Sequence, residues 1–546
     1  MTSTGAAANG RGLLPDLLEP SRDNPSPILT ARPAPTATSM AALRPTEQEI
    51  ARRLLSPGFD RWAEQAASTG HCARPVRLRG HATTLDRRTG EVLSRYDSSA
   101  EPDGVLYKRC GNRRASVCPS CSHEYKGDMW HLLAAGAAGG MKGVPASVAA
   151  HPLVFVTLTA PSFGAVHTTR RKGHGGAGRC RPRSGHRKTL CSHGRPTWCG
   201  ATHDDGDRRL GQPLCPGCYD YRAHVVWQWW APELWRRFTI GLQRALAARF
   251  GVTATALRRL VRLSFAKVAE FQRRAVVHFH ALVRLDGPAS AATEDDPFPA
   301  PLVDVPPVEL VALIRAVADR VRVDAPPTGP GDLTRRLAFG VQVDARPVSP
   351  DCDRDTDRSS APGSGQLHPE TVAAYIAKYA TKGCDDFGLP PRLRDPDTAR
   401  RMGVPEHVCR LLAEVRLVAT GGVEAYARMI RWVAMLGFRG HFATKSRRYS
   451  TTLGRLRSAR RRWQLRKLRA QPGDGSTDAA RDSDSDSDSD GDEDSTLVVG
   501  SWSLDGIGWL TGGDAALAAT AAAQAREWAD RRATAWRVDH EPAFIR

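Results

Sequence analysis

The sequence contains no apolar run that approaches the ~20 residues needed to cross a membrane as a helix. Its first residues also lack the basic segment followed by an apolar core that marks a secretory signal peptide. These two absences argue against a membrane-spanning and against a secreted protein. We therefore expect a cytoplasmic chain, in which twelve cysteines are not expected to form disulfides.

Acidic residues are scarce relative to basic ones. The chain has 58 Asp and Glu against 78 Lys and Arg, which gives a net charge of +20 and an isoelectric point near 9.9. Such an excess favours a phosphate-rich partner such as nucleic acid. An arginine excess is also typical of a GC-rich genome, so the charge needs a defined site to support it.

The length of 546 residues and the 41% hydrophobic content predict roughly three or four domains with real cores. Composition divides the chain into six regions. We expect a disordered N-terminal arm at 1–45 and an acidic disordered linker at 471–495. The other regions are 46–150, with a first cysteine cluster; 151–384, a core of strands and helices with a Cys- and His-rich insertion at 165–222; 385–470, basic and helical; and 496–546, a small strand and helix.

Two histidines stand in the apolar run "AVVHFHALV" at 275–283. Side chains alternate across a strand, so His278 and His280 share one face and can reach one metal ion. If "RRA" forms the preceding turn, Glu270 lies opposite His278 on that face and offers a third ligand. Taken alone, an H-x-H pair is more typical of two half-exposed strand histidines than of a metal site.

A second motif lies in "PETVAAYIAKYATKG" at 369–383, which has the pattern of a helix. Tyr375 and Tyr379 stand four residues apart on one face, and each is followed three residues later by a lysine, Lys378 or Lys382. A tyrosine oxygen can attack phosphorus when a metal withdraws charge from the phosphate, and an ammonium group can neutralise the charge that develops. The simpler interpretation is an amphipathic helix whose tyrosines pack on a sheet.

Three segments, in this order, resemble the three motifs of the HUH endonucleases that initiate rolling-circle replication: "VFVTLTAP", "EFQRRAVVHFHAL" and "YIAKYATK". Further segments resemble the replication initiators of actinobacterial plasmids and integrative conjugative elements: "LGQPLCPGCYDY", "APELWRRFT" and "MLGFRGHFATKSRRYSTTLG". The resemblance spans about 70–465.

The resemblance implies an α+β fold, with an HUH-type core built on a five-stranded antiparallel sheet with flanking helices. It also implies that His278 and His280 hold Mg²⁺ or Mn²⁺ on a central strand and face a tyrosine helix. One departure is Ala275, which stands where a glycine is expected in the turn and leaves the register of Glu270 open.

By the same likeness, a tyrosine attacks a phosphate in single-stranded origin DNA. The products are a 5′-phosphotyrosine and a free 3′-hydroxyl that primes a host polymerase; a helicase is a further possible partner. Related proteins with one tyrosine carry it at the position of Tyr379, so we expect Tyr379 to attack first and Tyr375 to act second or in termination.

The cysteines form two clusters that predict structural zinc sites. Each cluster contains a C-x-x-C pair, which supplies two thiolates to one tetrahedral ion, and zinc stabilises segments that lack an apolar core. The alternative is reduced, unliganded cysteines in a loop. The first group is Cys72, Cys110, Cys118 and Cys121; the second is Cys191, Cys199, His203, Cys215 and Cys218, with Cys180 and His193 as further candidates.

The stretch 445–469 is rich in arginine, with Tyr449 and Trp463 interleaved, which suits contacts to a DNA backbone and stacking on bases. A solvated helix face, or arginine stems that cover an apolar groove, would give the same pattern. The DNA-binding candidates are Lys445, Arg447, Arg448, Arg455, Arg457, Arg460, Arg461 and Arg462.

Two other classes of protein fit parts of these patterns. A relaxase or a single-strand transposase shares the histidine pair and the tyrosine, although in relaxases the tyrosine usually precedes the histidine strand. A zinc-stabilised DNA-binding regulator without cleavage activity would carry the histidine pair as a structural feature.

Overall fold

The structure is a computed structural model that describes residues 43–171, 177–180, 189–351, 366–469 and 496–540. The predicted acidic linker, and all but the end of the predicted N-terminal arm, lie outside these residues. The chain forms two compact units, which are Met1–Cys110 with Asp490–Arg546, and Gly111–Ser489. Within the described ranges, no helix combines the length and the apolar character needed to cross a membrane.

The first unit is built on a twisted sheet formed by both ends of the chain. Strand β1 (Val76–Asp86) pairs antiparallel along its whole length with β13 (Thr496–Ile507). On its other side β1 pairs with β2 (Val92–Asp97) and β3 (Leu106–Lys108). The strand and helix at 496–546, predicted from composition as a unit of their own, are therefore part of this sheet unit, because β13 finds its partner some 400 residues earlier in the chain.

Aromatic packing fills the core of the first unit. The ring of Trp509 lies 5.5 Å from that of Trp62 and 4.7 Å from that of Tyr107, and all three side chains are buried. The helices of this unit are α2 (Pro45–Leu54), α3 (Phe59–Ser68) and α13 (Gly512–His540).

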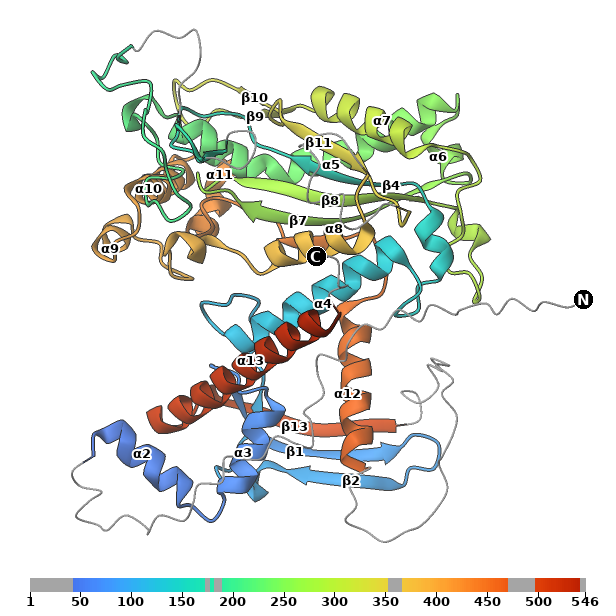
Figure 1. Cartoon of the computed structure of the whole chain (residues 1–546), viewed down its shortest axis with the longest axis vertical. Helices are drawn as coiled ribbons and strands as arrows, with labels where there is room; N and C mark the ends of the chain where they lie inside the picture. Colours follow the sequence, from blue (N-terminus) through green and yellow to red (C-terminus); the bar gives the residue numbers. More distant parts are fainter. Residues whose placement is uncertain (1–42, 172–176, 181–188, 352–365, 470–495, 541–546) are drawn as a thin grey trace, which may run out of the picture. The chain divides into compact units, whose positions relative to one another are not determined.

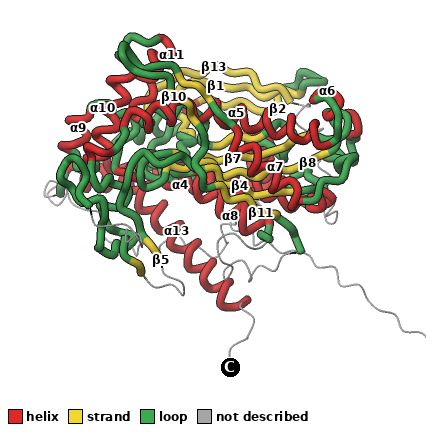
Figure 2. Tube along the Cα trace, turned by 90° about the horizontal axis from the view of Figure 1, so that it is seen from above, coloured by secondary structure: helices red, strands yellow, loops and turns green. Residues whose placement is uncertain are grey.

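The second unit contains a five-stranded sheet in the order β11-β4-β8-β7-β12, in which every neighbouring pair is antiparallel. The histidine strand β8 is the middle strand, and Figure 2 shows it running beside β4 and β7. Five antiparallel strands were expected, but β12 falls in the region predicted to be helical. The strands are β4 (Leu153–Leu158), β7 (Arg262–Phe271), β8 (Val277–Asp286), β11 (Val343–Pro347) and β12 (Ala443–Lys445).

Helices cover both faces of this sheet (Figure 1). The face that carries Phe279, Ala281 and Val283 packs on α5 (Tyr221–Arg249) and α7 (Pro307–Arg320) in the main core. The opposite face, which carries Leu282, packs on α4 (Pro119–Ala138) and α8 (Pro369–Ala380). The tyrosine helix α8 therefore lies on the same face of β8 as the two histidines.

Smaller elements complete the second unit. Its other helices are α6 (Ala254–Leu257), α9 (Pro396–Arg401), α10 (Glu406–Thr420), α11 (Glu424–Ala427) and α12 (Leu453–Arg469). Two short antiparallel ladders pair β5 (Arg170–Arg171) with β6 (Ala177–Gly178), and β9 (Val323–Ala325) with β10 (Arg335–Leu337).

Candidate active site

Three ligand-type side chains meet on one face of the β7–β8 hairpin. Glu270 pairs directly with His278, in the register that a turn at "RRA" predicts. One carboxylate oxygen, Oε2, lies 2.8 Å from Nε2 of His278 and 3.1 Å from Nε2 of His280. The other oxygen accepts a hydrogen bond from Nζ of Lys382 at 3.1 Å. We call Glu270, His278 and His280 the His/Glu triad.

The turn that sets this register uses an unusual residue. Ala275 has a φ of 60° and so occupies the left-handed region, where glycine was expected. Its carbonyl accepts hydrogen bonds from His224 and Gln228 of α5, both at 3.2 Å, and its own N–H donates to Gln272. These buried contacts hold the strained turn, so the alanine does not disturb the pairing of Glu270 with His278.

A residue that the sequence analysis missed supports His280. Thr157 pairs with His280 across β4 and β8, and its Oγ1 lies 3.0 Å from Nδ1 of the imidazole. Metal-binding histidines commonly use their second nitrogen in this way, which fixes the ring and its tautomer. The threonine is the one half-buried residue in an otherwise buried strand, and only the cross-strand register shows its role.

Both tyrosines of α8 lie over the triad. The ring of Tyr379 stacks on His280 at 5.2 Å with an interplanar angle of 22°, and the ring of Tyr375 meets His280 edge-on at 5.3 Å. The two tyrosine rings are 4.8 Å apart. Tyr375 is 44% exposed, whereas Tyr379 is only partly exposed and packs against the core of this face. The structure thus brings both predicted nucleophiles to the histidines.

The two predicted lysines also lie close to Tyr379. Nζ of Lys382 is 4.7 Å from the centre of its ring, and Nζ of Lys378 is 6.0 Å away. Arg113 donates hydrogen bonds to the carbonyls of Ala380 and Lys382 and so braces the end of α8. The helix end is thereby held where Lys382 can reach both the triad and the tyrosine.

Burial and hydrogen bonding set the protonation states of the site. Burial opposes the ionised form of Glu270, but hydrogen bonds with both histidines outweigh it and lower its pKa to about 2. Burial lowers the pKa of His280 despite its contact with Glu270. Burial, together with a hydrogen bond with Tyr375 that favours the neutral phenol and the charge of Glu270, raises the pKa of Tyr379. At neutral pH the site therefore presents a carboxylate, a neutral His280 and a neutral Tyr379 phenol.

The triad offers three ligand atoms that could hold one divalent cation. Its three ligand atoms all lie within 4.8 Å of one another, and the carboxylate contacts of 2.8 and 3.1 Å are close to the spacing of adjacent ligands around an octahedral Mg²⁺, about 2.8–3.0 Å. In addition, Nδ1 of His278 is buried and has no hydrogen-bond partner among the described atoms. A carboxylate also suits Mn²⁺, and neutral imidazole is the commonest metal ligand among side chains.

The second predicted zinc group is divided by the structure into two groups of four. Cys199 and His203 join His167 and Cys180, whereas Cys191, Cys215 and Cys218 join His193. The five predicted ligands therefore do not lie together, because ligands close in sequence alternate between two positions in space. His167 was missed, since nothing in its neighbourhood resembles a metal motif.

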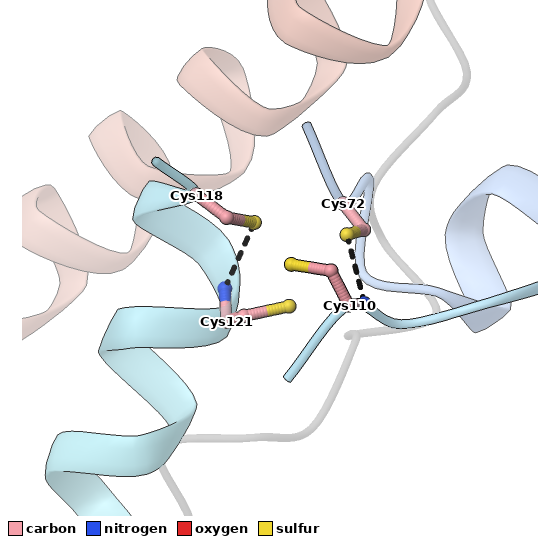
Figure 3. Close-up of side chains that lie close together, drawn as sticks. All are labelled: Cys72, Cys110, Cys118 and Cys121. Carbon is pink, nitrogen blue, oxygen red and sulfur yellow. Dashed lines mark hydrogen bonds between the residues drawn. The ribbon is translucent and has the colours of Figure 1, made fainter. Parts of the chain in front are cut away.

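The first predicted group has two cysteines in each unit, and Figure 3 labels all four. In the first unit, Sγ of Cys72 accepts a hydrogen bond from the N–H of Cys110 at 3.3 Å. In the second unit, Cys118 caps α4 and accepts from the N–H of Cys121 at 3.5 Å. Each unit thus supplies one pair of cysteines, and a zinc ion held by all four stays a prediction.

The basic segment is only partly available to DNA. Nζ of Lys445 donates to three backbone carbonyls, and burial lowers its pKa. Arg460 pairs with Glu124 and Asp128 of α4. Tyr449, expected to stack on bases, is fully buried beneath the guanidinium of Arg284.

Other basic candidates remain accessible. The exposed members are Arg447, Arg448, Arg455 and Arg457; Arg462 is half-buried, and the side chains of Arg461 and Trp463 lie outside the described ones. DNA binding by the exposed arginines stays a prediction.

Comparisons with known proteins agree with the likeness to replication initiators. No solved structure matches the chain. A curated replication initiator protein from Streptomyces ambofaciens is 37% identical over 477 residues, which cover 87% of this chain and 92% of the relative. A family profile described as "Replication initiator protein, pSAM2" matches residues 58–523, which include both units and the His/Glu triad. The chain therefore belongs to this family of replication initiator proteins.

Proposed function

We propose that the chain initiates rolling-circle replication by nicking single-stranded origin DNA with Tyr379. The phenolic oxygen attacks the scissile phosphorus, a tyrosine–phosphorus bond forms, and the bond from phosphorus to the 3′ oxygen breaks. The phenol loses one proton and the departing 3′ oxygen gains one, so the exchange is balanced without an external reactant. The products are a 5′-phosphotyrosine and a 3′-hydroxyl that a host polymerase can extend.

The observation that carries this proposal is the stacking of Tyr379 on His280 within the His/Glu triad, at 5.2 Å between ring centres. Mg²⁺ or Mn²⁺ held by His278, His280 and Glu270 would supply positive charge that polarises the phosphate and favours the phenolate. Glu270 stays ionised through the physiological range because its pKa is about 2. Thr157 keeps the imidazole of His280 in place.

The neighbouring groups divide the remaining tasks. Lys382, near both Glu270 and the ring of Tyr379, is suited to neutralise charge on the phosphate as the bond forms. Lys378 extends the cationic side of α8. Tyr375 lies 4.8 Å from Tyr379 and is more exposed, so it suits a second strand transfer or termination.

Origin DNA is the partner that a replication initiator requires, and the net charge of +20 suits it. Exposed Arg447, Arg448, Arg455 and Arg457 are the groups that we expect to contact its backbone. Structural zinc at the cysteine groups would order segments that lack an apolar core. A relaxase or transposase would share the tyrosine chemistry, and a regulator would bind DNA without it.

The test uses single strands tiled across the DNA that flanks the gene, incubated with the full chain and Mn²⁺. A strand labelled at its 3′ end should become covalently attached to the protein and survive denaturation. A strand labelled at its 5′ end should instead yield a shorter free fragment that a polymerase extends. This opposite fate of the two labels reports the polarity of the nick.

Matched variants identify the nucleophile. Tyr379→Phe should abolish the adduct while DNA binding in a gel shift persists, and Tyr375→Phe should retain the first adduct. An adduct lost only in Tyr375→Phe would reassign the nucleophile. Binding without an adduct under either metal would support the regulator, and adducts only at the two ends of a mobile element would support a transposase.

A further inference from the structure

In the described part of the insertion between β4 and α5, two groups of Cys and His side chains take no part in the His/Glu triad. The four ligand atoms of each group lie within 4.8 Å of one another. We propose that this insertion folds around two zinc ions and that it fixes the β7–β8 turn, which carries the triad. The first group is His167, Cys180, Cys199 and His203; the second is Cys191, His193, Cys215 and Cys218.

The first group has the geometry of a closed zinc site. Nε2 of His203 lies 3.1 Å from Nδ1 of His167 and 3.5 Å from Sγ of Cys199. Ligands bound to a tetrahedral zinc ion at 2.0–2.3 Å lie about 3.3–3.8 Å apart, which is close to these distances. The N–H of Thr168 donates to Sγ of Cys180 at 3.3 Å, an arrangement that stabilises a thiolate.

A carboxylate behind the first group orients its histidine. Nδ1 of His203 lies 2.6 Å from Oδ2 of Asp207, and Arg209 in turn binds that carboxylate at 2.7 Å. A carboxylate on one nitrogen commits the other nitrogen of an imidazole to the metal. Nε2 of His203 is the atom that faces the other three ligands, so the direction of this hydrogen bond agrees with zinc ligation.

The second group is shaped to accept an imidazole. Nδ1 of His193 lies 3.2 Å from Sγ of Cys218, and the ring covers Gly217 of the "CPGC" pair. A Cβ at Gly217 would lie only 2.7 Å from the ring, so only glycine leaves room for this histidine. Cys191 and His193 come from a small hairpin closed by a hydrogen bond from Thr197 to the carbonyl of Thr189.

The two groups are interleaved along the chain. Along the chain, the first two ligands belong to the first group and the next two to the second group. The following pair belongs to the first group again, and the last pair to the second. Neither ion can be bound without ordering the stretch that supplies the other, so we expect the two ions to bind cooperatively. The first group offers two thiolates and two imidazoles, and the second offers three thiolates and one imidazole. Both sets are typical of structural zinc and leave no open position for a substrate.

Backbone contacts connect the insertion to the triad. The chain at His167 pairs with 211–214 through hydrogen bonds to Gly211 and Gln212, both 2.9 Å long. Gly211 has a φ of 81°, and a Cβ there would lie 2.1 Å from the carbonyl oxygen of Arg273 in the β7–β8 turn. The insertion thus contacts the turn that sets Glu270 opposite His278.

The zinc assignment is tested on the full chain by measuring bound metal. Cys180→Ser/Cys199→Ser and Cys191→Ser/Cys218→Ser should each lose at least one zinc ion, and the four changes together should lose two. Cys409→Ser, at a buried thiol of α10 outside both groups, should lose none. Unchanged zinc in either double variant, or loss of a single ion from the combined one, would overturn the assignment.

Cobalt substitution of the unaltered chain guards against variants that fail to fold. Tetrahedral Co²⁺ bound by thiolates absorbs in the visible range. The unaltered chain should bind two more equivalents of such Co²⁺ than the quadruple variant, and zinc should displace them. An absence of this difference would also contradict the proposal. Metal content does not depend on strand cleavage, so this result stands apart from the fate of the proposed nicking reaction.

The link to the turn is tested by trypsin cleavage after Arg273 or Arg274, followed by mass spectrometry. Gly211→Ala should retain zinc but increase this cleavage at least about tenfold, because the new Cβ displaces the turn. Gly194→Ala is the matched control, since Gly194 also has a positive φ of 68° but has open space around it. Equal cleavage in the two variants would show that the insertion does not fix the turn.

Discussion

The second unit holds metal-ligand side chains in two regions that differ in how the chain fixes them. Around the His/Glu triad, the neighbouring Val277, Phe279 and Leu282 are fully buried, and each such side chain contributes about 1.5–3 kcal/mol to stability. In the insertion, Val166 and Leu210 are buried, but the large apolar residues Leu190 and Trp198 are 66% and 37% exposed. Zinc binding by Cys and His ligands contributes about 10–16 kcal/mol, enough to replace a missing core.

This comparison assigns different roles to the two kinds of site. The sheet presents its ligands ready-made, so a metal bound there is available for chemistry at the nearby tyrosines. The described part of the insertion buries few large apolar side chains, so a metal bound there would add to the stability of the fold. Removing ligands from the two regions should therefore have opposite consequences.

The largest effect that we expect is the contrast between removing a ligand of the triad and removing a ligand of the insertion. His278→Ala should reduce formation of the DNA adduct roughly 10³-fold, because the phosphate loses its activating charge, while protease resistance of the insertion stays unchanged. Cys218→Ser should instead open 189–222 to proteolysis. The adduct assay and limited proteolysis, run on both variants, measure this contrast. Proteolysis of the insertion in His278→Ala would contradict the division of roles.

A smaller effect is expected from Thr157, which contacts His280 from behind. Thr157→Val should raise the Mn²⁺ concentration needed for half-maximal adduct formation about 10- to 100-fold, because the imidazole loses the hydrogen bond that orients it. Thr159→Val is a suitable control, since that hydroxyl donates to the carbonyl of Gln342 instead. A shift in the control as large as that in Thr157→Val would remove the argument.

The smallest effect concerns the stability of the sheet itself. Lys267 of β7 is buried against Phe279, and burial lowers its pKa from 10.5 to about 8. Between these values the unfolded chain binds more protons than the folded one, so stability should rise as the pH increases from 8 toward 10.5. Lys267→Met should remove this rise and, at pH 7, stabilise the unit by about 1 kcal/mol.

Denaturant unfolding at several pH values measures this change. Lys126→Met, at an exposed position of α4, should leave the pH dependence as it is. A pH dependence that persists in Lys267→Met would show that another group causes it.

The sequence predicted those features that depend on local alternation. The histidine strand, its pairing with the strand of Glu270, and the tyrosine helix all follow from patterns of 2 or 3.6 residues. The position of the turn at Ala275 was predicted, but its left-handed conformation was not. The contacts from His224 and Gln228 that hold this conformation come from a helix distant in sequence.

Features that depend on distant pairing could not be predicted. The role of Thr157 requires the register of β4 against β8, and the pairing of β13 with β1 joins opposite ends of the chain. The sorting of the Cys and His ligands into two groups requires their positions in space. Tyr449 resembled an exposed stacking residue because its burial under Arg284 involves segments far apart in sequence.

The central claim is that Tyr379, beside the His/Glu triad, attacks the DNA. The most direct test is to trap the adduct on the unaltered chain, digest the DNA and the protein, and locate the nucleotide by mass spectrometry. Trypsin cleaves after Lys378 and Lys382, so residues 379–382 form a short peptide that carries Tyr379 without Tyr375. A nucleotide on this peptide is the predicted result, and a nucleotide on the peptide of Tyr375, or on neither, would contradict the account.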